Sequence, residues 1–364
     1  MTRGRFAPSP TGRMHLGNVF CALLSWLSAK SKGGEWVLRI EDLDPQRSKR
    51  DYALLLMDDL QWLGLPWDGE PVWQSQRGDI YEEYLQHLTN MGLTYPCYCT
   101  RADIMATQAP HETDGRVVYK GTCRPSAPSP LTPHRSPLTV SRSPLEATTR
   151  LIVPDCTIPF TDGHYGNHDI NLAEHCGDYV IRRKDGAWAY QLAVVVDDAL
   201  MGVTEIVRGR DLLLSSPQQI HLRELLFLKR KGENGKRKTN SLTPHPSPFT
   251  VDPSPLTPQT VPLRQGDEER SDGGGGLTAH PSPLTVDFFH HPLLCNSEGQ
   301  RLCKRDKSMD LGYLRGIGIT PQEIIGKLAY LAGLTDTTTP ITPSELLPLF
   351  SWDKVPTNDI RVKL

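Results

Sequence analysis

The sequence contains no long apolar run. A transmembrane helix needs about 18 or more predominantly apolar residues, whereas the best candidate, residues 19–29, is short and is interrupted by Ser25 and Ser28. The N-terminal stretch MTRGRFAPSPTG also lacks the apolar segment and the small-residue cleavage site of a secretory signal. We therefore expect a cytoplasmic protein without a transmembrane span or a membrane partner.

An excess of charge is also missing, because 40 Lys and Arg residues face 42 Asp and Glu residues, which gives a formal charge of −2. This balance excludes nucleic-acid binding that is driven by overall charge, but it is compatible with a local basic face. A disulfide framework is missing too, since only eight cysteines are spread over 364 residues. Such a pattern favours a reducing compartment and a metal site.

Proline, in contrast, is abundant and clustered. Segments 124–145 and 235–287 hold about half of the 31 prolines, and they share three near-copies of one decapeptide: LTPHRSPLTV, LTPHPSPFTV and LTAHPSPLTV. Copies at irregular spacing do not form a solenoid, and segments rich in Pro, Ser and Thr have no continuous apolar face. We expect these two segments to be flexible surface insertions that are either inert or used for docking. The rest of the chain is long enough for one enzyme.

The remaining sequence alternates between strand-like and helix-like segments. RFAPSP begins with a strand, residues 18–31 are helix-like, WVLRIEDLD is a second strand, and residues 48–63 have apolar side chains at helical spacing. This order predicts an α/β fold with a parallel sheet. The helix-like segment PQEIIGKLAYLAGL lies near the C-terminus.

The segment 178–209 predicts further strands. We expect a hairpin turned by Lys184-Asp185-Gly186, a buried strand over 192–196, and another strand over 204–207. Asp197 and Asp198 follow the buried strand, and we interpret them as a turn that lines the site rather than as a pair of metal ligands.

Cys97, Cys99 and Cys123 bracket a polar loop. Three thiolates in this pattern suit a structural zinc ion that pins a loop with little core of its own. Zinc needs a fourth ligand, and the residues alone suggest His111, because tyrosine is an uncommon ligand. Packing of free thiols is the alternative. The other cysteines have no partner spacing: Cys21, Cys156, Cys176, Cys295 and Cys303.

The motif His15-Leu16-Gly17-Asn18 follows the first strand and turn, at the expected start of a helix. Ligands of α/β sheets bind at the carboxyl ends of strands, where a helix N-terminus offers backbone N–H groups to phosphates. A histidine at this place can donate to a phosphate, and Gly17 lets a nucleotide approach the backbone closely. The alternative is that His15 only caps the helix.

Three segments together, RFAPSPTG at 5–12, HLGN at 15–18 and RIEDLD at 39–44, resemble the class I aminoacyl-tRNA synthetases of the glutamyl and glutaminyl group. The resemblance covers residues 3–230 and about 288–330. It implies a Rossmann-like, parallel-sheet catalytic domain that uses ATP with Mg²⁺ and acts on tRNA. In that family His15, Gly17 and Asn18 match the first nucleotide-binding signature.

The resemblance also implies a second, lysine-rich ATP-binding signature. The sequence Arg301-Leu302-Cys303-Lys304-Arg305 occupies the matching place after Gly299. It departs from the family pattern, with Arg301 for the first lysine and Cys303 for the serine, but it keeps Lys304 as the important second lysine. A shifted match over 304–308 would use Lys307, and a solvated basic loop is the further alternative.

Activation in this family is an in-line attack of the amino-acid carboxylate on the α-phosphate of ATP, with pyrophosphate as the leaving group. No protein nucleophile is needed, so catalysis rests on positioning and on charge stabilisation. The resemblance implies that His15 hydrogen-bonds the phosphates and that Lys304 offsets charge on the leaving group. These two are the expected catalytic residues.

The resemblance further implies a glutamate pocket. Arg5 and Arg208 would form forked hydrogen bonds to carboxylates, Glu41 would accept the ammonium group, and Tyr190 would add a hydroxyl contact. From spacing alone, Tyr190 and Arg208 would be ordinary strand residues. The stretch after the first strand would complete the pocket: Arg5, Phe6, Ala7, Pro8 and Ser9.

The chain looks most similar to the short paralogue of the glutamyl enzymes. In that paralogue the pattern Cys-x-Cys, then Tyr-x-x-x-Cys, matches Cys97, Cys99, Tyr119 and Cys123. The resemblance therefore replaces His111 by Tyr119 as the fourth ligand of one structural Zn²⁺. It also implies no anticodon-binding domain. The resemblance and the clustered prolines together predict the following division of the chain: catalytic halves 1–96 and 146–234, zinc-binding insertion 97–123, Pro-rich insertions 124–145 and 235–287, ATP signature loop 288–310, and helical segment 311–364.

In that paralogue, L-glutamate is activated with ATP without tRNA and is then joined to the queuosine base in the anticodon of tRNA(Asp). We expect the same of this chain, acting as a monomer. Two alternatives are a truncated glutamyl-tRNA synthetase that charges the 3′ end of tRNA(Glu), and a non-catalytic, zinc-containing tRNA-binding module. A glutaminyl enzyme is less favoured, because Arg5 and Arg208 together suit a second carboxylate.

Overall fold

The structure is a computed structural model that describes residues 1–106, 118–125, 147–227, 229–230, 251–252, 285–302 and 310–362. The two expected Pro-rich insertions lie almost entirely outside these ranges, and so do His111, Cys303, Lys304 and Lys307. Within the described ranges, none of the helices combines the length and the apolar character that a bilayer span requires.

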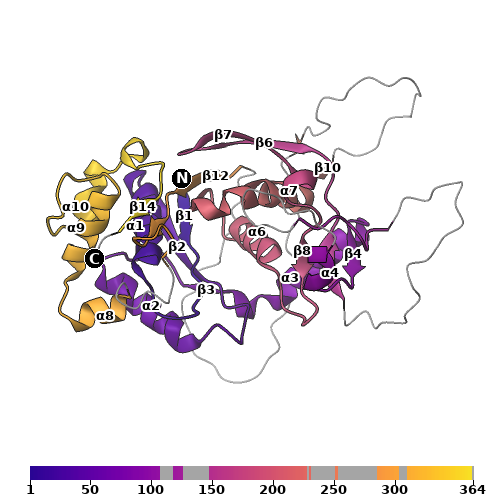
Figure 1. The fold of residues 1–364 in the computed structure, drawn as a ribbon, viewed down its shortest axis with the longest axis horizontal. Helices are drawn as coiled ribbons and strands as arrows, with labels where there is room; N and C mark the ends of the chain where they lie inside the picture. Colours follow the sequence, from indigo (N-terminus) through magenta and orange to yellow (C-terminus); the bar gives the residue numbers. More distant parts are fainter. Residues whose placement is uncertain are drawn as a thin grey trace, which may run out of the picture.

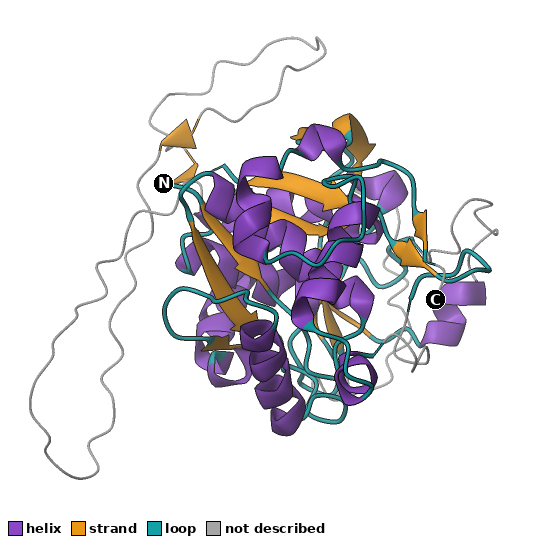
Figure 2. Ribbon diagram, turned by 90° about the vertical axis from the view of Figure 1, so that its left-hand side faces the viewer, coloured by secondary structure: helices purple, strands orange, loops and turns teal. Residues whose placement is uncertain are grey.

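A seven-stranded sheet runs through the centre of the molecule, with helices on either side of it (Figures 1 and 2). Its order is β3-β2-β1-β9-β12-β6-β7, and all neighbours are parallel except the hairpin of β6 and β7 at one edge. The predicted parallel sheet is confirmed. Its strands are β1 Arg3–Phe6, β2 Glu35–Ile40, β3 Val72–Trp73, β6 Thr157–Asp162, β7 Gly166–Asn171, β9 Glu205–Gly209 and β12 Asp287–His291.

The N-terminal part follows the predicted alternation of strands and helices. Helix α1 (Leu16–Ser31) connects β1 to β2, and α2 (Arg50–Trp62) lies between β2 and β3 in the chain. Helix α3 (Gly78–Asn90) comes next. Because β1 has β2 on one side and β9 on the other, the strand order reverses at β1, and ligands of such sheets bind where this reversal occurs.

Side chains of β1 alternate between the two faces of the sheet. A Cβ atom on Gly4 would lie 3.0 Å from Ala29 of α1, and Phe6 packs in the same core as α1. Arg5, between them, reaches Asp198 of α6 (Tyr190–Leu200). Helix α1 therefore covers one face, whereas α6 and the helix α7 (Ser216–Phe227) that packs against it cover the other.

The predicted buried strand over 192–196 is wrong, because these residues lie inside α6. A continuous apolar run does not distinguish a buried strand from a buried helix, and three consecutive valines weigh toward a strand. In the structure every residue from Leu192 to Ala199 is buried, as expected for a helix enclosed on all sides. Asp197 and Asp198 are consequently helical residues, not a turn at the end of a strand.

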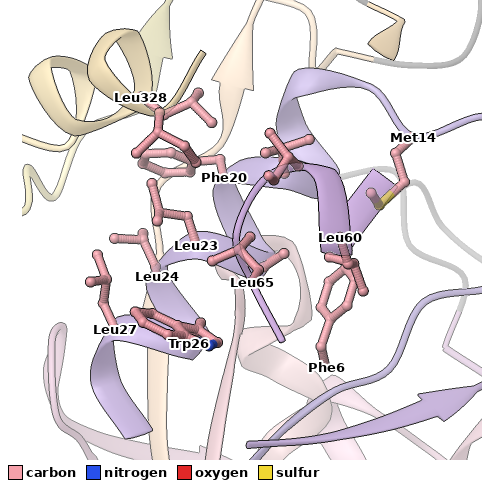
Figure 3. Close-up of a cluster of buried hydrophobic side chains, with 14 of the residues drawn as sticks. Phe6, Met14, Phe20, Leu23, Leu24, Trp26, Leu27, Leu60, Leu65 and Leu328 are labelled. Atoms are coloured by element: carbon pink, nitrogen blue, oxygen red, sulfur yellow. The ribbon is translucent and has the colours of Figure 1, made fainter. Parts of the chain in front are cut away.

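The main hydrophobic core lies between the sheet, α1 and the C-terminal helices (Figure 3). Helix α1 contributes the fully buried Phe20, Leu23 and Leu24, and Leu328 of α9 packs into the same cluster. The predicted helix near the C-terminus is thus confirmed and is firmly docked. The elements of this end are β13 Leu294–Cys295, α8 Leu311–Gly316, α9 Pro321–Leu331, α10 Pro343–Leu346 and β14 Ile360–Arg361.

A small antiparallel sheet, in the order β4-β5-β8, lies at the end of the molecule opposite α9 and α10 (Figure 1). After β8 the chain turns at 183–187, as predicted, and Arg182 pairs with Trp188. A further two-stranded sheet joins β10 and β11. These remaining elements are β4 Thr94–Cys97, α4 Arg101–Ala106, β5 Thr148–Leu151, α5 Leu172–His175, β8 Val180–Arg182, β10 Lys229–Arg230 and β11 Val251–Asp252.

Candidate active site

A cavity of about 900 Å³ opens at the carboxyl-terminal edge of the sheet. Its walls come from the residues after β1 and β2, from the end of β9 and from the N-terminus of α1. This is the point at which the strand order reverses. The cavity brings together all the described residues that were predicted to bind nucleotide or glutamate: Arg5, Phe6, Ala7, Pro8, Ser9, His15, Gly17, Asn18, Glu41, Tyr190 and Arg208.

His15 caps helix α1 at the cavity wall. Its Nδ1 accepts a hydrogen bond from the Gly17 N–H (3.1 Å), and the Asn18 side chain accepts one from the His15 N–H (3.2 Å). In a neutral imidazole whose Nδ1 accepts, Nε2 carries the proton and is a donor. A Cβ atom on Gly17 would lie 2.9 Å from the His15 ring, so glycine is needed for the ring to fold back. Capping and ligand contact are therefore compatible functions of one side chain.

Arg208 is a buried cation whose hydrogen-bond acceptors are uncharged. It is 4% exposed, and it donates from Nε to His290 Nε2 (3.0 Å), from Nη1 to Gln219 Oε1 (2.7 Å) and from Nη2 to Ser216 Oγ (2.8 Å). Burial lowers the pKa of Arg208, and the Tyr190 hydroxyl acts against this shift. A guanidinium removed from water is stabilised by a neighbouring anion. This wall of the cavity is suited to a carboxylate.

Arg5 and Glu41 belong to a buried ion-pair network. Asp198 Oδ1 accepts from Arg39 Nη1 at 2.6 Å and from Arg5 Nε at 3.4 Å, and Arg39 Nη2 donates to Glu41 Oε1 at 3.2 Å. Burial alone would raise the pKa of Asp198, but the guanidinium groups of Arg39 and Arg5 hold it below its usual value. For Glu41, burial outweighs Arg39 and raises the pKa. Asp198 thus orients Arg5, and Arg39 orients Glu41.

Asp197 extends this network on the side of α3. Its carboxylate accepts hydrogen bonds from Gln74 Nε2 (2.8 Å), Arg77 Nε (2.6 Å) and the Tyr81 hydroxyl (2.7 Å). Both side-chain oxygens of Asp197 and Oδ1 of Asp198 therefore accept from protein donors, and the nearby guanidinium groups disfavour a bound cation. Their function in the structure is to hold arginines.

The segment expected to carry the second ATP signature begins and ends beside the cavity. Leu302 is buried in the main core and lines the cavity, and Asp310 forms a backbone bridge with His15. Arg301 pairs with Asp211, and both line the cavity. Residues 303–309, which include Lys304, lie outside the described ranges, so the function of Lys304 stays a prediction.

A second cleft, of about 850 Å³, leads from the cavity toward the cysteine cluster. It shares Ser9, Glu41 and Tyr190 with the first cavity and reaches Cys99 at its far end. Trp188 also lines it. Cationic side chains are frequent along the cleft, which suits a polyanion: Arg47, Arg101, Arg150, Arg183 and Lys184.

The predicted zinc ligands lie together. The Sγ atoms of Cys97, Cys99 and Cys123 are within 4.8 Å of one another, and those of Cys99 and Cys123 are 3.5 Å apart. The Tyr119 hydroxyl oxygen lies 3.4 Å from Cys97 Sγ and 3.7 Å from Cys99 Sγ. The Arg150 guanidinium stacks over the Tyr119 ring, 3.8 Å from its centroid, and fixes the ring in place.

This donor set fits a tetrahedral zinc ion. Zn–S bonds of about 2.3 Å at tetrahedral angles separate two sulfurs by about 3.8 Å, and the Sγ atoms of Cys99 and Cys123 are 3.5 Å apart. With a Zn–O bond of about 2.0 Å, a sulfur and an oxygen ligand are separated by about 3.5 Å, and the Tyr119 oxygen lies 3.4 Å and 3.7 Å from two of the sulfurs. Cys97 and Tyr119 are buried, whereas Cys99 and Cys123 are partly exposed. Three thiol groups and one phenol group therefore lie close enough together to bind one ion.

A sequence model of the family described as tRNA synthetases class I (E and Q), catalytic domain, matches residues 1–234, which is well over half of the chain. The chain belongs to this synthetase family. The predicted family and its α/β fold are confirmed, and the synthetase is a ligase.

Relatives of this synthetase carry a more specific name. A glutamyl-Q tRNA(Asp) synthetase from Symbiobacterium thermophilum is 37% identical over 372 residues, which cover 100% of this chain and 96% of the relative. One from Neisseria meningitidis is 47% identical over 226 residues, which cover 62% of this chain and 72% of the relative. A solved glutamate tRNA ligase from Elizabethkingia meningosepticum has a TM-score of 0.67 at 24% identity, covering 100% of this chain and 67% of that chain, which shows a shared fold.

The sequence did not reveal three residues that support the synthetase site, namely Arg39, Asp162 and His290. All three are polar residues at less than 2% exposure. Arg39 and His290 interrupt apolar strands, in WVLRI and DFFHH, and a charged or polar residue within an apolar strand is the signal that could have found them.

Proposed function

We propose that this synthetase activates L-glutamate with ATP and transfers the glutamyl group to the queuosine base in the anticodon of tRNA(Asp). The observation that carries the proposal is Arg208, a buried cation with uncharged acceptors that shares one cavity with His15 at a helix N-terminus. A carboxylate site beside a phosphate site suits a reaction that joins an amino acid to a nucleotide. The names of the relatives supply the acceptor.

Glutamate binding rests on opposite charges across the cavity. Arg208 and Arg5 bind the carboxylates, Glu41 accepts the ammonium group, and Tyr190 adds a hydroxyl contact, while the stretch from Arg5 to Ser9 shapes the floor. Arg5 already pairs with Asp198, whereas Arg208 has uncharged acceptors, so Arg208 is the stronger carboxylate partner. Glutamine, with one carboxylate fewer, gains less from this pair of guanidinium groups.

Activation forms a bond between a glutamate carboxylate oxygen and the α-phosphorus of ATP, breaks the bond from that phosphorus to the bridging oxygen, and releases pyrophosphate. His15 donates from Nε2 to a phosphate oxygen, and Gly17 and Asn18 keep the helix start open to the nucleotide. Lys304 offsets the charge of the leaving group, and Mg²⁺ accompanies ATP. Leu302 and Asp310, on either side of the Lys304 segment, both contact the cavity region.

Transfer breaks the acyl–phosphate bond of the adenylate, forms a bond from the acyl carbon to the acceptor atom of the modified base, and releases AMP. The acceptor RNA lies in the second cleft, where cationic side chains meet its phosphates and Trp188 offers a surface for stacking. This cleft runs between the reacting groups and the cysteine cluster.

One structural zinc ion is held by Cys97, Cys99, Tyr119 and Cys123. It supplies a cross-link within the insertion 97–123, whose described residues add only a few side chains to a small core. Cys99 also lines the second cleft, so the ion keeps the far wall of the cleft in place and takes no part in the reaction.

The first test is incorporation of labelled glutamate into two bulk tRNA pools, one from cells that make queuosine and one from cells that do not. Labelling of the first pool alone supports the proposed acceptor. Equal labelling of both pools would indicate charging of a 3′ end and would exclude the proposed acceptor. Absence of glutamate-dependent exchange of pyrophosphate into ATP would favour the binding-module alternative.

A further inference from the structure

Resting on the proposed function, we infer that Asp162 and His290 form a positioning relay behind Arg208, which holds the guanidinium in the geometry that binds the carboxylate of the amino-acid substrate. The relay is a row of three buried side chains, each 4% exposed or less. It touches the substrate only through Arg208, so Asp162 and His290 are positioning residues and not catalytic ones.

The hydrogen bonds of the relay allow one arrangement of protons. The guanidinium of Arg208 has donors only, and its Nε donates to His290 Nε2 at 3.0 Å. His290 Nε2 is therefore unprotonated, and the ring proton lies on Nδ1, which donates to Asp162 Oδ2 at 2.6 Å. Burial, and more weakly the charge of Arg208, lowers the pKa of His290 to about 4, so the ring is neutral at physiological pH.

Three adjacent parallel strands build the relay. Arg208 of β9 is the register partner of His290 on β12, and Asp162 at the end of β6 is the register partner of Phe288 on β12. The carboxylate of Asp162 also accepts from the backbone N–H groups of His164 (3.0 Å) and Tyr165 (2.8 Å). The carboxylate end of the relay is thus anchored to backbone.

The next residue, Gly163, explains how the β6–β7 turn comes so close to β12. A Cβ atom on Gly163 would lie 2.1 Å from the ring of Phe289, and the Gly163 N–H donates to the Phe288 carbonyl at 2.8 Å. Only a residue without a side chain allows this approach. The turn therefore delivers Asp162 to His290 at a fixed distance.

The interposed imidazole lets Asp162 orient Arg208 without forming an ion pair with it. Arg5 and Arg39 contact the carboxylate of Asp198 directly, so part of their charge is compensated within the protein. Arg208 is one ring away from the carboxylate of Asp162. Its charge remains directed to a ligand in the cavity, while the angle of its Nε–H is held by His290.

Substitutions at both relay positions test the inference. His290→Phe keeps a ring but removes the acceptor, whereas His290→Gln retains an acceptor oxygen. Asp162→Asn can donate to Nδ1 and so favours the tautomer with a proton on Nε2, which would face the Arg208 N–H. The matched control is His221→Phe in α7. His221 is also a buried histidine, and burial lowers its pKa to about 4, but it does not line the cavity.

The measurements are glutamate-dependent pyrophosphate exchange, with KM determined separately for glutamate and for ATP, and calorimetric binding of glutamate without ATP. We expect His290→Phe and Asp162→Asn to weaken glutamate binding and to raise its KM by about 10- to 100-fold. The KM for ATP should change less than about threefold, and His290→Gln should recover most of the loss.

Unchanged glutamate affinity in folded Asp162→Asn and His290→Phe proteins would overturn the inference. An equal rise in both KM values, or the same effect in His221→Phe, would reveal a merely structural function and would overturn it as well. If His290→Phe fails to fold, Asp162→Asn and His290→Gln decide between these outcomes. A wild-type protein without any exchange activity would instead contradict the proposed function.

Discussion

Asp198 and Arg39 form an ion pair in the centre of the molecule, with Arg39 Nη1 2.6 Å from Asp198 Oδ1 and with both side chains removed from solvent. Arg5 and Glu41 depend on this pair, because Asp198 also accepts from Arg5 and Arg39 also donates to Glu41. The pair joins β2 to α6, and it holds in place both the cationic Arg5 and the anionic Glu41 of the cavity.

Asp198→Asn should therefore lower the free energy of unfolding by about 3–5 kcal/mol, because it removes the buried charge that both Arg5 and Arg39 contact. Denaturant unfolding measures this loss. Glu82→Gln is the control, since Glu82 pairs with Arg182 at the surface (2.6 Å) and such pairs contribute less than about 1 kcal/mol. Equal effects of the two substitutions would contradict the importance of the buried pair.

Tyr119→Phe should weaken zinc binding by at least about tenfold, because it removes one oxygen from the cluster while the ring stays under Arg150. Competition with a chromophoric chelator measures the affinity directly. Tyr95→Phe is the matched control, since Tyr95 lies in the same small core but donates to Asp178 (2.6 Å). Retention of wild-type affinity in Tyr119→Phe would exclude Tyr119 as a ligand.

Lys304→Ala should reduce glutamate-dependent pyrophosphate exchange by about 10²-fold or more, on the scale of one lost charge contact in the transition state. Lys307→Ala, three residues along the same segment, should retain most of the activity. The reverse result would show that the second ATP signature is shifted to 304–308, and that Arg301 lies outside it.

Stability should fall as the pH drops from about 6.5 toward 4. Burial lowers the pKa of three histidines, His221, His290 and His291, from 6.5 to about 4. Between pH 4 and pH 6.5 the unfolded chain binds protons at these histidines that the folded chain does not. Their contribution to the free energy of unfolding is therefore complete above pH 6.5. As the pH falls below this value, each histidine loses about 1.4 kcal/mol of that contribution per pH unit. Burial raises the pKa of Glu41, so this group changes the stability with pH in the opposite direction.

Thermal unfolding between pH 7.5 and 4.5 measures this dependence. A melting temperature that stays constant over this range would contradict it. His221→Phe removes one titrating group without touching the cavity, and its profile should be flatter than that of the wild-type protein.

The sequence predicted the parts of the fold whose signals are local. The order β1, α1, β2, α2 followed from periodicity, and the helix start at His15 followed from its position after a strand and a turn. Helix α6 was missed because consecutive valines and a buried apolar run are shared by strands and enclosed helices. What decides between them is the packing of α6 against the sheet and α7, which no short window of sequence contains.

The residues of the site were likewise predictable only where their signal is local. Residues within recognisable motifs, such as His15, Glu41 and Arg208, were predicted and share one cavity. His290 and Asp162 were not, because their importance arises from the register of β9, β12 and β6, and strand register between segments more than 80 residues apart has no local signature. The pairing of Asp198 with Arg39 depended on α6 being a helix.

The long segment between α7 and β12 rejoins the sheet at Asp287, beside Glu205, where both strands begin. The cavity lies at the other edge, where the same strands end. The chain therefore enters β12 at the edge of the sheet that lies away from the cavity. This edge is a natural place at which to graft a reporter or an affinity handle into the chain.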